Sequence, residues 1–119
     1  MATYTYKVTG DPKVALTEAL STLQQMEYSV TQDSEWSATA EVGSSAKVAL
    51  LGAVSPHIRL SVQVAAQADG AIVTLAQTTT GAAGGLIGMS RVRKAVKNAG
   101  EGVRKALQAT GQLVDTQVS

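Results

Sequence analysis

The stretch that decides the fold is IRLSVQVAAQADGAIVTLAQ, residues 58–77. From Ile58 to Val64, apolar side chains alternate with polar ones, which is the period-two pattern of a strand with one buried face. Ala68-Asp69-Gly70 then interrupts the pattern with residues typical of a tight hairpin turn, in which Gly70 can adopt a positive φ. Residues 71–77 supply the partner strand. The stretch therefore predicts an antiparallel hairpin.

The N-terminal third of the chain predicts a strand, a helix and two further strands. Residues 4–9 alternate with period two, and apolar residues then recur at helical spacing over about Pro12–Met26. Asp11 is a suitable N-cap, and proline is favoured at the first helical position. Two more short alternating segments, residues 28–32 and 36–42, predict strands.

The connection and the C-terminal region are less regular. Residues 46–54 fit either a strand or a short helix, and the sequence leaves both open. A final helix is predicted over about Arg91–Thr110, with Ser90 as its N-cap. Gly100 and Gly102 lie inside it, and each glycine costs about 1 kcal/mol relative to alanine in a helix interior. Either the helix breaks near Asn98-Ala99-Gly100, or close packing against another backbone offsets this cost.

These elements predict an α+β fold in a single domain covering residues 1–119. The expected order is strand, helix, two strands, the ambiguous segment, two strands and helix. We expect an antiparallel sheet of four to five strands, with the long C-terminal helix packed across one face. The tail from about residue 111 is expected to fray, because chain ends are commonly poorly ordered.

The predicted final helix is amphipathic and basic. Its apolar stripe consists of Val92, Val96, Ala99, Val103 and Leu107. The candidate anion-facing residues on its other side are Arg91, Arg93, Lys94, Lys97 and Arg104. Before Arg91 the chain has four Lys or Arg and seven Asp or Glu; from Arg91 onward it has six and two. The simplest interpretation is a solvated surface, and the functional alternative is a surface that faces anions.

A glycine-rich apolar segment precedes this helix and supplies candidate binding residues. Its glycines are Gly81, Gly84, Gly85 and Gly88, of which the last three are candidates, and its apolar residues are Leu86, Ile87 and Met89. We expect the segment to be a loop, and apolar loop residues must be buried in a core, ligand, partner or membrane. Leu51 and Val54 belong to a second apolar loop. Trp36 is a further candidate for ligand stacking, although packing in the core is the usual role of such a residue.

Several kinds of chemistry have no support in the sequence. There is no cysteine, and His57 is the single histidine, so we expect no metal site and no catalytic residue. The glycine-rich segment lacks the Gly-Lys-Ser/Thr of a phosphate-binding loop, and we expect no cofactor. The four aromatic residues do not form the stacking platform of a nucleic-acid reader. We expect no enzyme, no sequence-specific binding of nucleic acid and a cytoplasmic location, since no signal peptide or membrane span is evident.

Three functional hypotheses follow for a small non-enzymatic protein. The first is a binding module with an apolar or lipid-like ligand between the sheet and the C-terminal helix. The second is an interaction or self-assembly module that uses the apolar loops. The third is peripheral attachment to an anionic membrane through the basic helix.

Overall fold

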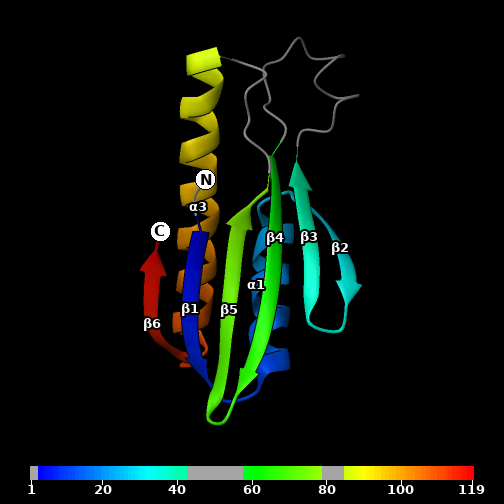
Figure 1. The fold of residues 1–119 in the computed structure, drawn as a ribbon, viewed down its shortest axis with the longest axis vertical. Coiled ribbons are helices and arrows are strands. Elements are labelled where there is room, and N and C mark those ends of the chain that lie inside the picture. The colour runs from blue at the N-terminus through cyan, green and yellow to red at the C-terminus, as the bar shows by residue number, and fades with distance from the viewer. Residues whose placement is uncertain (1–2, 43–57, 79–84) are drawn as a thin grey trace.

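The computed structural model describes residues 3–42, 58–78 and 85–119, and in its last helix it describes side chains from Val92 onward. The elements are β1 (Thr3–Thr9), α1 (Pro12–Gln25), β2 (Ser29–Ser34), β3 (Ser37–Val42), β4 (Ile58–Gln67), β5 (Gly70–Gln77), α3 (Gly85–Ala109) and β6 (Leu113–Val118). The six described strands form one antiparallel sheet in the order β2-β3-β4-β5-β1-β6. Both α1 and α3 lie on the same side of it (Figure 1). The predicted α+β fold, with an antiparallel sheet and a C-terminal helix packed across it, is confirmed.

The hairpin of residues 58–77 forms as predicted, but the prediction for Gly70 is wrong. β4 and β5 pair in the register Val64↔Val73. Among the described glycines, positive φ angles occur at Gly10 and Gly111 and not at Gly70. A Cβ atom on Gly70 would instead overlap the carbonyl oxygen of Val8 in β1. Glycine is therefore required at this position by the close approach of the neighbouring strand.

The helix predicted over Pro12–Met26 is confirmed as α1. Asp11 caps it, because its carboxylate accepts a hydrogen bond of 2.9 Å from the backbone N–H of Lys13. Pro12 occupies the first turn, where its missing N–H has no intrahelical partner to lose. The helix ends at Gln25, and Glu27 adopts a φ of 72° as the chain turns into β2.

The expectation that the chain frays from about residue 111 is wrong. Gly111, with a φ of 78°, turns the chain out of α3, and Leu113–Val118 then pairs with β1 as the edge strand β6. Ser119 and Thr3 exchange two backbone hydrogen bonds of 2.9 Å. β6 supplies partners for the backbone groups on the outer side of β1, which explains why the tail is ordered.

The last helix begins earlier than predicted and does not break. α3 already starts at Gly85, so Ser90 is an interior residue and not its N-cap. The helix also continues through Gly100 and Gly102. Extending a helix that already exists is much less costly than nucleating one, so the segment that begins at Gly85 can continue it despite its glycines.

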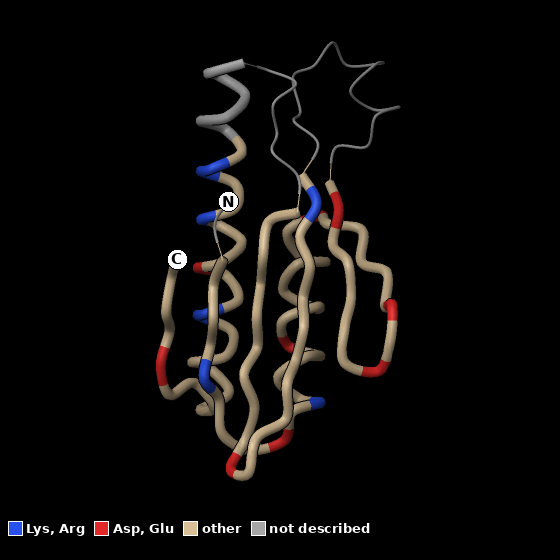
Figure 2. Tube along the Cα trace, viewed as in Figure 1, with Lys and Arg blue, Asp and Glu red and all other residues tan. Residues whose placement is uncertain are grey.

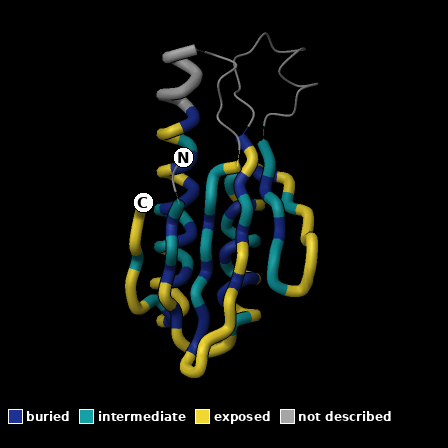
Figure 3. Tube along the Cα trace, viewed as in Figure 1, coloured by how far each residue is buried: buried dark blue, intermediate teal, exposed yellow. Residues whose placement is uncertain are grey.

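The core lies between the helices and one face of the sheet. Along the central strands, buried positions alternate with intermediate or exposed ones (Figure 3), and the buried ones carry mainly Val, Leu, Ile, Ala and Tyr. The opposite sheet face carries mainly uncharged polar residues. In one row across it, Thr5 lies beside Thr74 and Thr74 beside Gln63. The predicted ambiguity over residues 46–54 lies outside the described residues.

Candidate functional site

The buried side of α3 fixes which side is free for binding. The predicted apolar stripe is confirmed: Val92, Val96, Ala99, Val103 and Leu107 are each at most 2% exposed and belong to the core. Through this side α3 packs against α1, β1 and β6. The described part of the interface between α3 and the sheet is thus filled by protein side chains, which an apolar ligand would have to displace.

Two tyrosines from β1 hold the C-terminal half of α3. The hydroxyl group of Tyr6 donates a buried hydrogen bond of 2.6 Å to the carbonyl oxygen of Gly100. Tyr4 stacks beside Tyr6 with ring centroids 6.5 Å apart, and its ring lies against Gly100. A Cβ atom at position 100 would be 2.6 Å from the nearest atom of that ring. The helix is therefore unbroken and closely packed at Gly100, but the neighbour is the side chain of Tyr4 and not another backbone, which corrects that part of the prediction.

The pKa values of Tyr4 and Tyr6 are raised, mainly because both side chains are buried. Burial raises the pKa of Tyr6 well above its ordinary value, and the neighbouring Tyr4 and Glu101 add to the shift. Burial also raises the pKa of Tyr4, again with a contribution from Glu101. Both phenols therefore stay neutral at physiological pH, and Tyr6 is a hydrogen-bond donor that positions the helix.

The exposed side of α3 carries cations that have no partner among the described residues. Arg93, Lys94 and Lys97 are exposed, and none of them forms a hydrogen bond or ion pair with another described residue. Arg93 and Lys97 are four residues apart and hence neighbours on the helix surface, where like charges repel. Their placement agrees with the sequence prediction. The side chain of Arg91, a fourth candidate, lies outside the described part of α3.

Arg104 was also predicted to face anions, but the structure engages it within the helix. Its guanidinium forms an ion pair of 2.9 Å with Glu101 and a hydrogen bond of 3.3 Å with the side-chain oxygen of Gln108. The spacing of three residues between Glu101 and Arg104 was the sequence signal for this pair. Near the C-terminal end of α3, Lys105 is exposed and has no partner among the described residues.

Charge is segregated between α3 and the rest of the chain. Residues 85–109 contain six Lys or Arg and one Glu, a net charge of +5, whereas the remaining residues contain four Lys or Arg and eight Asp or Glu, a net charge of −4. In Figure 2 basic positions recur along α3, and acidic positions appear at the turns and along β2. The helix is therefore a basic surface on an otherwise acidic protein.

The predicted apolar candidates divide into three groups. Gly85, Leu86, Ile87, Gly88 and Met89 belong to the first two turns of α3 and not to a loop, which corrects the prediction. Gly84, Leu51 and Val54 lie outside the described residues, as does His57. Trp36 is half-buried and packs against the core, and its carbonyl oxygen accepts a 2.9 Å hydrogen bond from the N–H of Val64.

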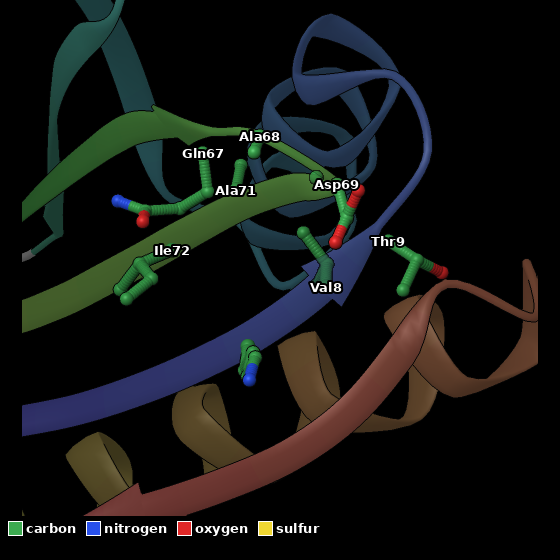
Figure 4. A pocket seen from close by; sticks show the side chains of 9 residues that line it. Val8, Thr9, Gln67, Ala68, Asp69, Ala71 and Ile72 are labelled. Carbon is green, nitrogen blue, oxygen red and sulfur yellow. The ribbon is translucent and has the colours of Figure 1, made fainter.

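A shallow hollow that the sequence did not reveal lies on the open sheet face, beside the β4–β5 turn (Figure 4). Its volume is about 320 Å³. Its walls include Lys7, Thr9, Gln67, Asp69 and Ile72. The hollow depends on the approach of β1 to Gly70, a contact between distant parts of the chain. It mixes one cation and one anion, so it offers no surface of a single sign comparable to that of α3.

Other classes of site find no support in the described part of the chain. No group of three or more His, Asp or Glu residues there could hold a metal ion. No helix in that part is long and apolar enough to span a bilayer. In comparisons with known proteins, no family model and no curated protein sequence matched this chain.

Proposed function

We propose that this protein is a non-enzymatic module that attaches reversibly to anionic membrane surfaces through Arg93, Lys94 and Lys97. The observation that carries the proposal is that these three cations are exposed and have no partners among the described residues. They lie on the solvent side of α3, whose other side is buried in the core. An anionic surface would relieve the repulsion between Arg93 and Lys97.

The distribution of charge favours a planar partner over nucleic acid. The rest of the chain carries a net charge of −4, so a polyanion that wrapped around the protein would meet repulsion. A membrane contacts one side only. The aromatic residues Tyr4, Tyr6 and Tyr28 are buried in the core, where they cannot stack on bases.

The expected attachment is weak. Each Lys or Arg close to an anionic bilayer contributes about 1 kcal/mol, so three contribute about 3 kcal/mol. Such binding is reversible and sensitive to salt, because exposed charges are screened within a Debye length. We place the protein on the cytoplasmic leaflet, which is rich in anionic lipids.

The test is flotation with vesicles of phosphatidylcholine alone or mixed with phosphatidylglycerol. We expect the protein to float with the mixed vesicles and not with the neutral ones. The triple variant R93Q/K94Q/K97Q is expected to lose affinity by about 100-fold, because each charge is worth about 1 kcal/mol.

The matched control is K7Q/K13Q/K105Q, which removes the same charge from two exposed lysines outside α3 and from Lys105 near the C-terminal end of α3, beyond the Arg93–Lys97 cluster. We expect this variant to bind nearly as well as the unmodified protein. Equal losses in both triple variants would show that net charge acts without a site. Equal flotation with neutral and anionic vesicles, or no flotation with either, would rule out the proposal.

The apolar-ligand and self-assembly hypotheses have no comparable support among the described residues. The stripe of α3 that faces the sheet is occupied by the protein's own core. The exposed large apolar residues of the described chain are Val14, Val114 and Val118. Val14 is on α1 and the two others are on β6, so they do not coincide with the predicted loop candidates.

A further inference from the structure

The strand β6 lies at one edge of the sheet, beside β1, and its outer side pairs with no described strand (Figure 1). Ser119 and Thr3 exchange two backbone hydrogen bonds, so they form a hydrogen-bonded pair of the antiparallel ladder. Because such pairs alternate with non-hydrogen-bonded ones, the backbone groups of Gln117 also point toward β1. Those of Thr116 and Val118 therefore point outward, away from the sheet.

The side chains of β6 add exposed apolar surface to this edge. Val118 lies opposite Tyr4, and Thr116 lies opposite Tyr6, so both are on the helix side of the sheet. Val114 is two residues earlier, at the irregularity of the β1–β6 pairing, and alternation places it on the same side. Val114 is 56% exposed and Val118 is 60% exposed, and no other large apolar side chain of the described strands is exposed.

The other edge strand, β2, has a different character. Apart from Val30, which is half-buried and packs against the core, every residue of Ser29–Ser34 is polar and exposed. This edge therefore offers no apolar surface to a partner. The edge formed by β6 combines unpaired backbone groups with β-branched side chains, which pack well across paired strands.

A second copy of β6 fits this edge in one antiparallel register. Outward-pointing backbone groups must meet each other, so the pairing can be centred on Asp115, Thr116 or Gln117. Centring it on Asp115 places two carboxylates opposite each other, which is destabilising. Centring it on Gln117 places Val114 beyond the end of the partner's β6. Centring it on Thr116 pairs Val114 of each copy with Val118 of the other.

The charges next to this edge are compatible with the central register. On the open face, Asp115 would lie between Lys7 of its own chain and Gln117 of the other copy, so no like charges are opposed there. On the helix side, Glu101 and Arg104 form an ion pair with each other. The whole chain has a net charge of +1, so two copies repel each other only weakly.

The exposed cations of α3 are also kept apart. Gly100 is hydrogen-bonded to Tyr6, which lies opposite Thr116, so a two-fold axis at Thr116 passes beside this point of α3. The cations of the segment Arg93–Lys97 precede Gly100 in each copy. Because the two copies of α3 would run antiparallel, their two sets of cations lie on opposite sides of the axis.

We infer that the protein forms a symmetric dimer in which two β6 strands pair antiparallel, centred on Thr116, and join the two sheets into one. The two-fold axis is perpendicular to the sheet, so the helices of both copies lie on the same side. The interface uses a strand edge and not the predicted apolar loops or the cations of α3, and it is therefore independent of the proposed membrane attachment. The paired edge is short, so the dimer is weak and dissociates on dilution.

Sedimentation equilibrium of the unmodified protein, from micromolar to millimolar concentration, tests for the dimer. We expect a monomer–dimer equilibrium without larger species, because pairing β6 with β6 occupies the same edge in both copies and closes the assembly. A monomer over the whole range of concentration would overturn the inference. Oligomers that keep growing with concentration would also overturn it, because they require two different surfaces.

Two double variants test the register. V114E/V118K places Glu opposite Lys across the interface, whereas V114E/V118E places Glu opposite Glu. The first keeps the net charge at +1 and the second changes it to −1, so overall repulsion between copies is similar. We expect the dissociation constant of V114E/V118E to exceed that of V114E/V118K by about tenfold or more. Equal dissociation constants would contradict the register.

Amide hydrogen exchange locates the interface without any substitution. We expect exchange of the Thr116 N–H to slow as the concentration rises through the range in which the dimer forms, because this group becomes hydrogen-bonded. Exchange of the Gln117 N–H, which already points toward β1, should change less. Exchange at Thr116 that is independent of concentration in a protein that dimerises would overturn the assignment of the interface to β6.

Discussion

The two halves of α3 share one apolar stripe but differ in what surrounds their other sides. In the C-terminal half, from Asn98 to Ala109, Tyr6 holds the carbonyl of Gly100, and Glu101 pairs with Arg104. In the N-terminal half, Arg93 and Lys97 have no partner among the described residues. Both halves are anchored in the core through the stripe, so we expect them to differ in their other sides: contacts with β1 and within the helix in the C-terminal half, and charge available to the proposed partner in the N-terminal half.

The largest effect is expected where β1 contacts the C-terminal half. In G100A the new methyl group would lie within 2.8 Å of three atoms of the Tyr4 ring. Overpacking typically costs about 1–3 kcal/mol, and the better helix propensity of alanine returns about 1 kcal/mol. We expect G100A to lower the free energy of unfolding by about 2 kcal/mol at most, measured by denaturant titration.

Gly102 provides the matched control for this substitution. A Cβ atom there would be 3.0 Å from the sulfur of Met26, a flexible side chain that can move. We expect G102A to leave stability unchanged or to raise it by up to about 1 kcal/mol, through helix propensity. A loss in G102A as large as that in G100A would contradict the special role of the tyrosine contact.

The next effect concerns the hydrogen bond from Tyr6. Y6F keeps the ring and removes the hydroxyl group that donates to Gly100. Because a buried hydrogen bond contributes about 1 kcal/mol net, we expect a loss of this size in the free energy of unfolding. Affinity for anionic vesicles should not change. A loss of vesicle binding in folded Y6F would contradict the expectation that the Tyr6 contact affects stability and not binding.

Alkaline pH should weaken the same region. Burial raises the pKa of Tyr6, Tyr4 and Tyr28 above the model-compound value of 10.0, with Glu101 contributing at Tyr4 and Tyr6. The unfolded chain therefore releases these protons at lower pH than the folded chain. The contribution of these neutral, buried tyrosines to the free energy of unfolding is therefore fully present below about pH 10, and it is lost as the pH rises above that value.

Tyrosinate absorbance during an alkaline titration checks this prediction. We expect the signal to appear together with loss of the circular dichroism of the folded protein. Ionisation of all three tyrosines near pH 10 in a protein that remains folded would contradict the buried environment described for them.

The smallest stability effect is expected in the N-terminal half. The variant R93Q/K94Q/K97Q removes repulsion between like charges, and such pairs cost about 0.2–0.5 kcal/mol each. We expect its thermal midpoint to equal or slightly exceed that of the unmodified protein. A marked fall in the thermal midpoint would show that these cations stabilise the fold, which would contradict the assignment of their charge to binding alone.

The elements that sequence predicted well are those whose pattern is local. The alternation in residues 58–77 and the spacing in α1 depend on near neighbours, and the stripe of α3 follows from the same periodicity. β6 was missed because its partner is β1, about a hundred positions away. The β-branched residues Val114, Thr116 and Val118, which follow Gly111, were the available signal for it.

Prediction of the candidate site from sequence was limited in the same way, to features that depend on near neighbours in the chain. Exposure of Arg93, Lys94 and Lys97 followed from the helical wheel, and the structure agrees. The contact of Tyr6 with Gly100 joins residues 94 positions apart and had no sequence signal. Periodicity identifies a face of a helix, but tertiary contacts decide which part of that face is free.

The most direct test of the central claim is the salt dependence of binding between the unmodified protein and phosphatidylglycerol-containing vesicles. If the N-terminal half of α3 supplies unpartnered charge to the membrane, affinity will be measurable at low ionic strength. It will then fall steeply as salt rises, since exposed charges are screened. No binding at low ionic strength, or an affinity that does not change with salt, would contradict the account.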